Sequence, residues 1–178
     1  TDNTIIVFTT DHGELLGDHG LWLKGPFHYE ELLNIPMIVR WPQGGVSGGR
    51  RASGLISLVD VAPTLLSALG ASVPDECDGV DALRLLRGES DAVRDHAIIE
   101  CTDDPRGLRR KTVVTENRKL THYHGHDFGE LYDLERDPGE LANYWDDTAN
   151  GKDRQRLMAL LIDHAEALER RQTRLCYA

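Results

Sequence analysis

Apolar positions in the first half of the chain indicate short strands alternating with helices. Residues 5–10 and 36–41 are almost continuously apolar, with little alternation between hydrophobic and polar positions. This pattern is typical of strands that are buried on both faces, as in a parallel sheet. Three segments between and after these strands are expected to be helices, at residues 27–33, 57–70 and 82–86.

Capping and breaking residues support the longest of these helices. Ser57 or Asp60 can cap its amino end, and Pro63 is tolerable because it falls in the first turn. Gly70 is placed to end the helix. The segment 43–51 contains four glycines, which leave little to pack, so we expect a surface loop there.

The second half of the chain has a different pattern. Residues 111–115 and 119–123 are short β-prone runs on either side of Glu116-Asn117, which indicates an antiparallel hairpin. Further strands are expected at 96–101 and 131–134. From Asp153 onward, apolar residues recur at helical spacing and predict a terminal amphipathic helix: Leu157, Leu160, Leu161, Ala165 and Leu168.

The order of these elements predicts an α/β protein in two parts. Residues 1–92 are expected to form part of an α/β domain. Residues 93–178 are expected to form a small α+β unit, in which an antiparallel sheet is followed by the terminal helix.

Charge and cysteine content narrow the classes of partner. A net charge of -10 and a pI near 5.2 argue against nucleic acid or an anionic membrane as the main partner, although local positive charge still permits a small anionic substrate. No apolar run approaches the roughly 18 residues of a membrane-spanning helix. The three cysteines, Cys77, Cys101 and Cys176, lack metal-site spacing and do not suggest a disulfide framework.

Asp11 and His12 directly follow the first predicted strand, and catalytic groups gather at such strand ends. A carboxylate oxygen and an imidazole nitrogen could hold a divalent cation there. Alternatively, Asp11 caps a turn and His12 is a surface residue. Asp18-His19 could repeat the ligand pair, but the glycines on either side favour a turn.

Lys24 and a group of histidines are the remaining candidates for chemistry. Lys24 lies between Trp22 and Gly25-Pro26, an apolar setting in which an ammonium could bind a phosphate or sulfate oxygen, although a solvated lysine is the alternative. His122, His124 and His126 lie close together in a predicted strand and the following turn, as a solvated or substrate-facing cluster.

Five blocks in the same order together resemble the carboxyl-terminal half of sulfatases, in the alkaline-phosphatase-like superfamily. The resemblance covers about residues 4 to 145 and implies the carboxyl-terminal part of an α/β/α sandwich plus a small subdomain. The blocks are T-T-D-H-G-E-L-L-G-D-H-G-L-W-L-K-G-P, N-I-P-M-I-V-R-W-P, L-V-D-V-A-P-T-L-L-S-A-L-G, D-G-V-D-A-L-R-L-L-R-G and G-E-L-Y-D-L-E-R-D-P-G-E-L-A-N.

The resemblance assigns expected roles to particular residues. Asp11 and His12 would complete a divalent metal site, usually calcium in sulfatases, and Lys24 would contact the sulfate. His122 and His124 would face the substrate pocket. The expected activity is hydrolysis of sulfate esters. The alternatives are a phosphonate monoester or phosphodiester hydrolase of the same superfamily, which often uses manganese or zinc, and a non-catalytic fragment or binding module.

One family motif is missing from the 178 residues. The nucleophile of the family is a formylglycine made from Cys or Ser in a C/S-x-P-x-R motif, and none of the cysteines begins that pattern. The chain begins without Met and enters a strand almost at once, as a piece of a longer protein would. We therefore expect the amino-terminal half of the same protein to supply the nucleophile, and the chain alone to be inactive.

Overall fold

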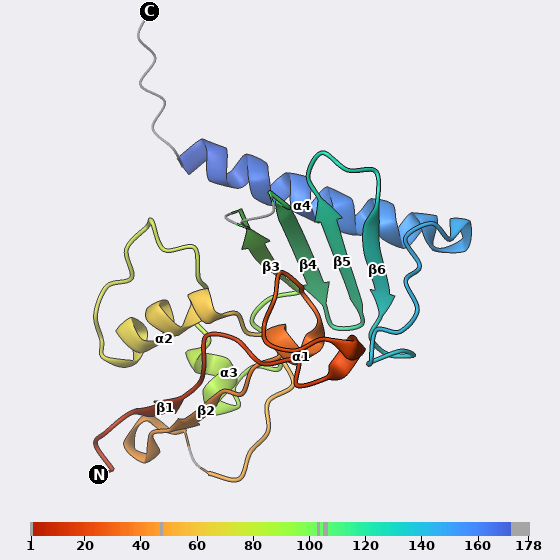
Figure 1. Cartoon of the computed structure of the whole chain (residues 1–178). Coiled ribbons are helices and arrows are strands. Elements are labelled where there is room, and N and C mark those ends of the chain that lie inside the picture. The colour runs from red at the N-terminus through yellow and green to blue at the C-terminus, as the bar shows by residue number, and fades with distance from the viewer. Residues whose placement is uncertain (1, 47, 103, 105–106, 172–178) are drawn as a thin grey trace, which may run out of the picture. The chain divides into compact units, whose positions relative to one another are not determined.

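The computed structural model describes residues 2–46, 48–102, 104 and 107–171. Two compact units make up the chain, Thr1–Ala97 and Ile98–Ala178, and each is described by itself (Figure 1). The domain boundary expected at residue 92 remains a prediction, since compactness does not test whether either unit folds alone. Cys77 and Cys101 are free thiols, and Cys176 lies outside the described residues.

In the first unit, β1 (Ile6–Phe8) and β2 (Ile38–Arg40) form an antiparallel two-stranded ribbon, with Val7 opposite Val39. The expectation of strands buried on both faces is therefore wrong for this chain. Alternate side chains of an antiparallel pair point to opposite faces, and one face can stay open. The open face carries large apolar side chains that are 48%, 59% and 63% exposed: Ile6, Phe8 and Ile38.

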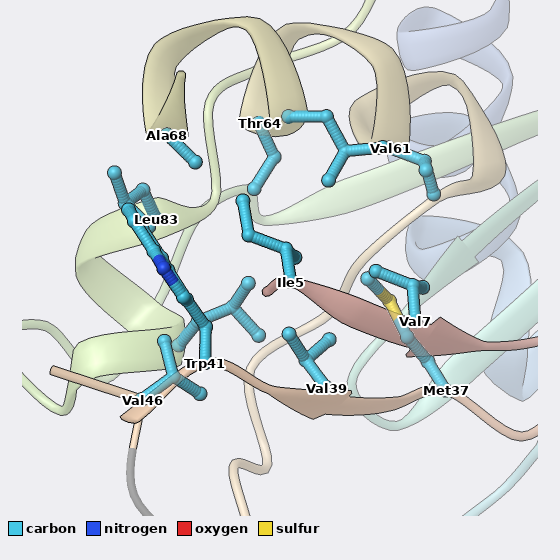
Figure 2. A pocket seen from close by; sticks show the side chains of 12 residues that line it. Ile5, Val7, Met37, Val39, Trp41, Val46, Val61, Thr64, Ala68 and Leu83 are labelled. Atoms are coloured by element: carbon cyan, nitrogen blue, oxygen red, sulfur yellow. The ribbon is translucent and has the colours of Figure 1, made fainter. Parts of the chain in front are cut away.

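Helices cover the other face of the ribbon. The predicted helices form, although α1 and α2 are shorter than expected and α3 begins and ends one residue later: α1 (Glu30–Leu33), α2 (Val61–Ala68) and α3 (Leu83–Arg87). Figure 2 shows side chains from the ribbon, α2 and α3 pointing toward one another around a small apolar pocket. Apart from Thr64, the side chains that line the pocket are apolar, as in a hydrophobic core. The lining residues are Ile5, Val7, Met37, Val39, Trp41, Val46, Val61, Thr64, Leu65, Ala68, Leu83 and Leu86.

The glycine-rich segment after β2 is more ordered than expected. A 3-10 turn, η2 (Pro42–Gly44), follows Trp41, and Trp41 bridges to Val46. Val46 is buried, with 5% of its surface exposed, so this part of the loop contributes a side chain to the core. The glycines allow the tight reversal: a side chain at Gly44 would overlap the Trp41 ring.

Asp60 connects several segments of the first unit. Ser57 and Asp60 form a capping box around η3 (Leu58–Asp60), directly before α2. The completely buried Asp60 carboxylate accepts hydrogen bonds from the backbone N–H of Ser57 at 2.8 Å and of Val80 at 2.7 Å. Its two oxygens also accept from Nε and Nη2 of Arg94. Gly70, at φ 72°, follows α2 as predicted.

Replacing Asp60 by alanine is expected to lower the free energy of unfolding by about 3 kcal/mol or more, because it leaves a nearly buried guanidinium and two backbone N–H groups without their acceptor. Urea unfolding followed by tryptophan fluorescence measures the loss. Asp91→Ala, at an exposed acid of the same unit, is the control, with an expected change within about 0.5 kcal/mol. Equal small effects of the two substitutions would contradict the role given to Asp60.

The second unit is a four-stranded sheet with a long helix. The strand order is β3 (His96–Cys101), β4 (Arg110–Thr115), β5 (Arg118–Tyr123) and β6 (Gly129–Asp133), and the pairs β4–β5 and β5–β6 are antiparallel. The predicted hairpin, strands and terminal helix are confirmed, and the helix α4 runs over Gly151–Arg171. None of the helices in the described ranges is both long and apolar enough to cross a membrane.

The two faces of this sheet differ in chemistry. One face packs against α4 through a buried cluster: Val113, Leu120, Leu131, Leu157 and Leu161. The opposite face is polar although it is buried, and there Thr112 and Thr121 share a hydrogen bond of 2.8 Å. On the same face, the ammonium of Lys119 lies 2.5 Å from the carboxylate of Glu140, with both side chains almost fully buried. The second unit therefore has an apolar and a polar core layer.

Candidate active site

Asp11 and His12 follow β1 after two threonines, at the predicted place. The Thr10 hydroxyl donates to Asp11 Oδ1 at 3.2 Å and is also 3.2 Å from the carbonyl oxygen of His12. The backbone N–H of His12 donates to the same carboxylate oxygen at 3.1 Å. Asp11 Oδ2 and His12 Nε2 lie 3.6 Å apart. The carboxylate and the imidazole therefore converge on one point at the end of the strand.

Hydrogen bonds hold the Asp11 carboxylate ready for a cation. A hydrogen bond from its own backbone N–H lowers the pKa of Asp11 below its usual value, with further contributions from the Thr10 hydroxyl and the nearby His12. The Asp11 side chain is 83% exposed, so a metal ion could reach it. Asp11 thus stays ionised to lower pH than an ordinary aspartate.

The ring of His12 is held in one orientation. Its Nδ1 lies 2.7 Å from the carbonyl oxygen of Gly13, which can only accept, so Nδ1 carries the proton and Nε2 presents a lone pair. Lys24 Nζ lies 3.1 Å from that Nε2 and donates to it. The nitrogen that faces the Lys24 ammonium is therefore also the one that could bind a metal.

These residues fit part of a divalent metal site. Asp11 offers a hard oxygen and His12 a nitrogen of intermediate softness. Calcium prefers oxygen ligands alone, so the nitrogen ligand suits manganese or zinc better than calcium. Two ligands are fewer than the about six to eight oxygens that calcium takes or the four ligands of a zinc site. Among the described residues, no group of three His, Cys, Asp or Glu side chains gathers around this pair, so any metal held here would need further ligands.

The segment that leads to Lys24 turns back as expected. Asp18–Gly20 forms a 3-10 turn, η1, so the prediction of a turn at Asp18-His19 is confirmed. Lys24 itself is exposed, and its neighbour Trp22 is 72% exposed. The apolar setting expected for the Lys24 ammonium is therefore missing in this chain, because the aromatic ring beside it points into solvent instead of packing over it.

His122 and His124 belong to the second unit. His122 lies on the face of β5 that also carries Leu120, the face covered by α4, and its ring stacks against Trp145 at 6.5 Å. Burial, and then the nearby His124, lower the pKa of His122 below its ordinary value. His124 is exposed just beyond β5. That these two histidines face substrate remains a prediction.

Two features of the site were not predicted from the sequence. Thr10 orients Asp11 through its hydroxyl, and a hydroxyl beside an aspartate is a common local turn signal that could have indicated it. The ring of His19 stacks on Tyr29 and lies near Glu31, contacts that span ten or more positions of the chain. No local sequence signal announces such contacts.

Comparisons with known proteins agree with this arrangement. Residues 17–167 match the family model described as N-sulphoglucosamine sulphohydrolase, C-terminal. The N-acetylglucosamine-6-O-sulfatase of Bacteroides thetaiotaomicron is 34% identical over 167 residues, covering 90% of this chain and 30% of that protein. A solved structure of a protein in complex with its substrate D-glucosamine-2-N,6-O-disulfate superposes with a TM-score of 0.86 and 32% identity, over 96% of this chain and 36% of that one.

A second kind of hydrolase is also similar in structure. The phosphonate monoester hydrolase of Agrobacterium radiobacter superposes with a TM-score of 0.79 and 31% identity, over 91% of this chain and 35% of that one. The fold is thus the predicted α/β fold of the alkaline-phosphatase-like class. Within that class the chain belongs to the sulfatase family, where it corresponds to the carboxyl-terminal part. It spans about a third of the length of these relatives.

Proposed function

We propose that this chain is part of a sulfatase that hydrolyses sulfate esters, and that it contributes two metal ligands and a sulfate-binding lysine. The observation that carries the proposal is the convergence of three groups at the end of β1. Asp11 Oδ2 lies 3.6 Å from His12 Nε2, and Lys24 Nζ lies 3.1 Å from the same nitrogen, in a chain of the sulfatase family.

Each of the three residues has a distinct role in this proposal. Asp11 and His12 would hold the divalent ion, which the family resemblance implies to be calcium and which supplies positive charge to the ester oxygens. The Lys24 ammonium would bind a sulfate oxygen and stabilise the negative charge that develops as the ester bond breaks. The bond from His12 Nδ1 to the Gly13 carbonyl oxygen selects the neutral tautomer whose Nε2 lone pair faces the metal. The substrate is therefore a small sulfate ester, and its identity is set elsewhere in the protein.

The nucleophile is expected from an amino-terminal segment of the same protein. The motif from which the family makes formylglycine does not occur in the 178 residues. The open face of the ribbon, formed by Ile6, Phe8 and Ile38, is suited to apolar packing against such a segment. We therefore expect the two segments to complete the metal site together.

Two assays test the proposal. The chain alone, with an aryl sulfate and calcium, is expected to show no multiple turnover, while the protein with its amino-terminal segment hydrolyses the ester. Clear multiple turnover by the chain alone would contradict the missing-nucleophile argument. Absence of a C/S-x-P-x-R motif in the reading frame upstream of Thr1 would contradict the assignment to formylglycine chemistry.

A phosphonate monoester or phosphodiester hydrolase is the second candidate. The similarity to the phosphonate monoester hydrolase of Agrobacterium radiobacter favours it, as does the imidazole ligand of His12, which suits manganese or zinc. Parallel assays of an aryl sulfate and an aryl phosphonate monoester, each with calcium, manganese or zinc, distinguish the two activities. A non-catalytic binding module is the third candidate, against which the intact Asp11, His12 and Lys24 argue.

A further inference from the structure

The segment between His12 and Lys24 has an unusual backbone. Leu16, His19 and Leu23 adopt positive φ angles of 49°, 55° and 65°, a region that side chains other than glycine enter at a cost of about 1 kcal/mol or more each. Backbone hydrogen bonds close the turn between them, including Leu21 N–H to Asp18 O at 2.9 Å. Such a conformation persists only where the surrounding structure holds it in place.

His19 makes the contacts that could hold this segment. Its ring lies parallel to that of Tyr29, with 3.8 Å between centroids and 9° between planes. Its Nε2 lies 3.7 Å from the Glu31 carboxylate, and its side chain is only 12% exposed. The adjacent Asp18 is exposed. In the middle of the turn, His19 is therefore fastened to Tyr29 and Glu31, at the start of α1.

The same short helix also fixes the other end of the segment. Directly after His12, the N–H of Gly13 donates to the carbonyl oxygen of Leu32 at 2.9 Å. The approach is so close that a Cβ on Gly13 would come within 1.8 Å of the Glu31 carbonyl oxygen. Thus α1 meets the chain once beside the proposed metal ligands, at Gly13, and once on the way to Lys24, at His19.

We propose that His19 is a positioning residue, which holds the segment against α1 so that the Lys24 ammonium stays close to the proposed metal site and within reach of the sulfate. His19 acts through Lys24 and touches neither metal nor substrate. The proposal rests on the function proposed above for Lys24. A small displacement of Lys24 would weaken its bond to the developing charge, because such bonds depend steeply on distance and alignment.

His19→Asn is the sharpest test. Asparagine tolerates a positive φ, so the variant removes the ring stack and the contact with the Glu31 carboxylate while leaving the backbone preference nearly intact. In the complete enzyme we expect kcat/KM for an aryl sulfate to fall about tenfold or more, and Glu31→Gln to produce a smaller loss. The control is Asp18→Asn, in the same turn, which should leave the rate unchanged within about twofold.

A double-mutant cycle separates positioning from general destabilisation. If His19 acts through Lys24, His19→Asn should cost little further activity in a Lys24→Met background. If His19→Asn lowers activity equally in the parent enzyme and in Lys24→Met, the proposal is overturned. It is also overturned if Lys24→Met is impaired but His19→Asn has a normal rate. If instead Lys24→Met has a normal rate, the proposed function of Lys24 is what fails.

Hydrogen exchange of the 178-residue chain gives a readout that does not depend on activity. In His19→Asn, the amides of Gly17 and Leu21 are expected to exchange at least about tenfold faster, while the amide of Leu69, bonded within α2, keeps its rate. Unchanged protection of Gly17 and Leu21 would show that His19 does not hold the segment.

Discussion

Replacing Lys24 by methionine is expected to lower kcat of the complete sulfatase by at least about two orders of magnitude, because the substitution removes the ammonium that we propose stabilises charge developing on the sulfate. Methionine keeps most of the side-chain length. Since Lys24 is exposed, the protein should keep its stability. The measurement is steady-state hydrolysis of an aryl sulfate at saturating calcium.

The distribution of the effect between kcat and KM is informative. If Lys24 binds the sulfate more strongly in the transition state than in the ground state, kcat and kcat/KM fall together, whereas a rise in KM alone indicates uniform binding. Lys152→Met, at an exposed lysine of α4, is the matched control and should retain normal kinetics. Near-normal turnover of Lys24→Met would reject the role assigned to this lysine.

Replacing Lys119 by methionine is expected to lower the free energy of unfolding by about 3–5 kcal/mol. The substitution leaves the Glu140 carboxylate, which is 1% exposed, without the ammonium that lies 2.5 Å from it. A buried carboxylate that loses this ammonium loses an attraction that offsets the cost of its lost hydration. Chemical denaturation, compared between variant and parent, measures the loss.

Two variants separate this effect from a general effect of losing a lysine. Lys111, on the neighbouring strand β4, pairs with Glu100, but both side chains are about a third exposed. Lys111→Met should therefore cost no more than about 1 kcal/mol. The double variant Lys119→Met with Glu140→Leu should recover much of the stability, because no unpaired charge remains. A loss below about 1 kcal/mol in Lys119→Met alone would contradict the argument.

Local sequence patterns predicted most helices and strands, because helical periodicity, turns and caps depend on residues that are close together in the sequence. The spacing of Leu157 and Leu161 follows the helical repeat, and this predicted α4. The turn at Glu116-Asn117 between two β-prone runs predicted the β4–β5 hairpin. Ser57 and Asp60 were correctly identified as capping residues, since a cap depends on neighbours within one helical turn.

The candidate site was predicted less completely. The resemblance singled out Asp11, His12 and Lys24, and the structure brings them together at the end of β1. It could not indicate the tautomer of His12 or its hydrogen bond from Lys24, because these depend on the path of the intervening turn. The contacts of His19 with Tyr29 and Glu31 depend on that path too.

The sequence by itself determined the elements of this protein, its family, and the residues that carry its proposed chemistry. Only the tertiary structure decided that β1 pairs antiparallel with β2 and leaves Ile6 and Phe8 exposed, and that Lys119 is buried beside Glu140. The physical reason is the distance along the sequence over which each interaction acts. Periodicity and capping act within a few residues, whereas strand pairing and burial join segments whose meeting depends on the whole chain.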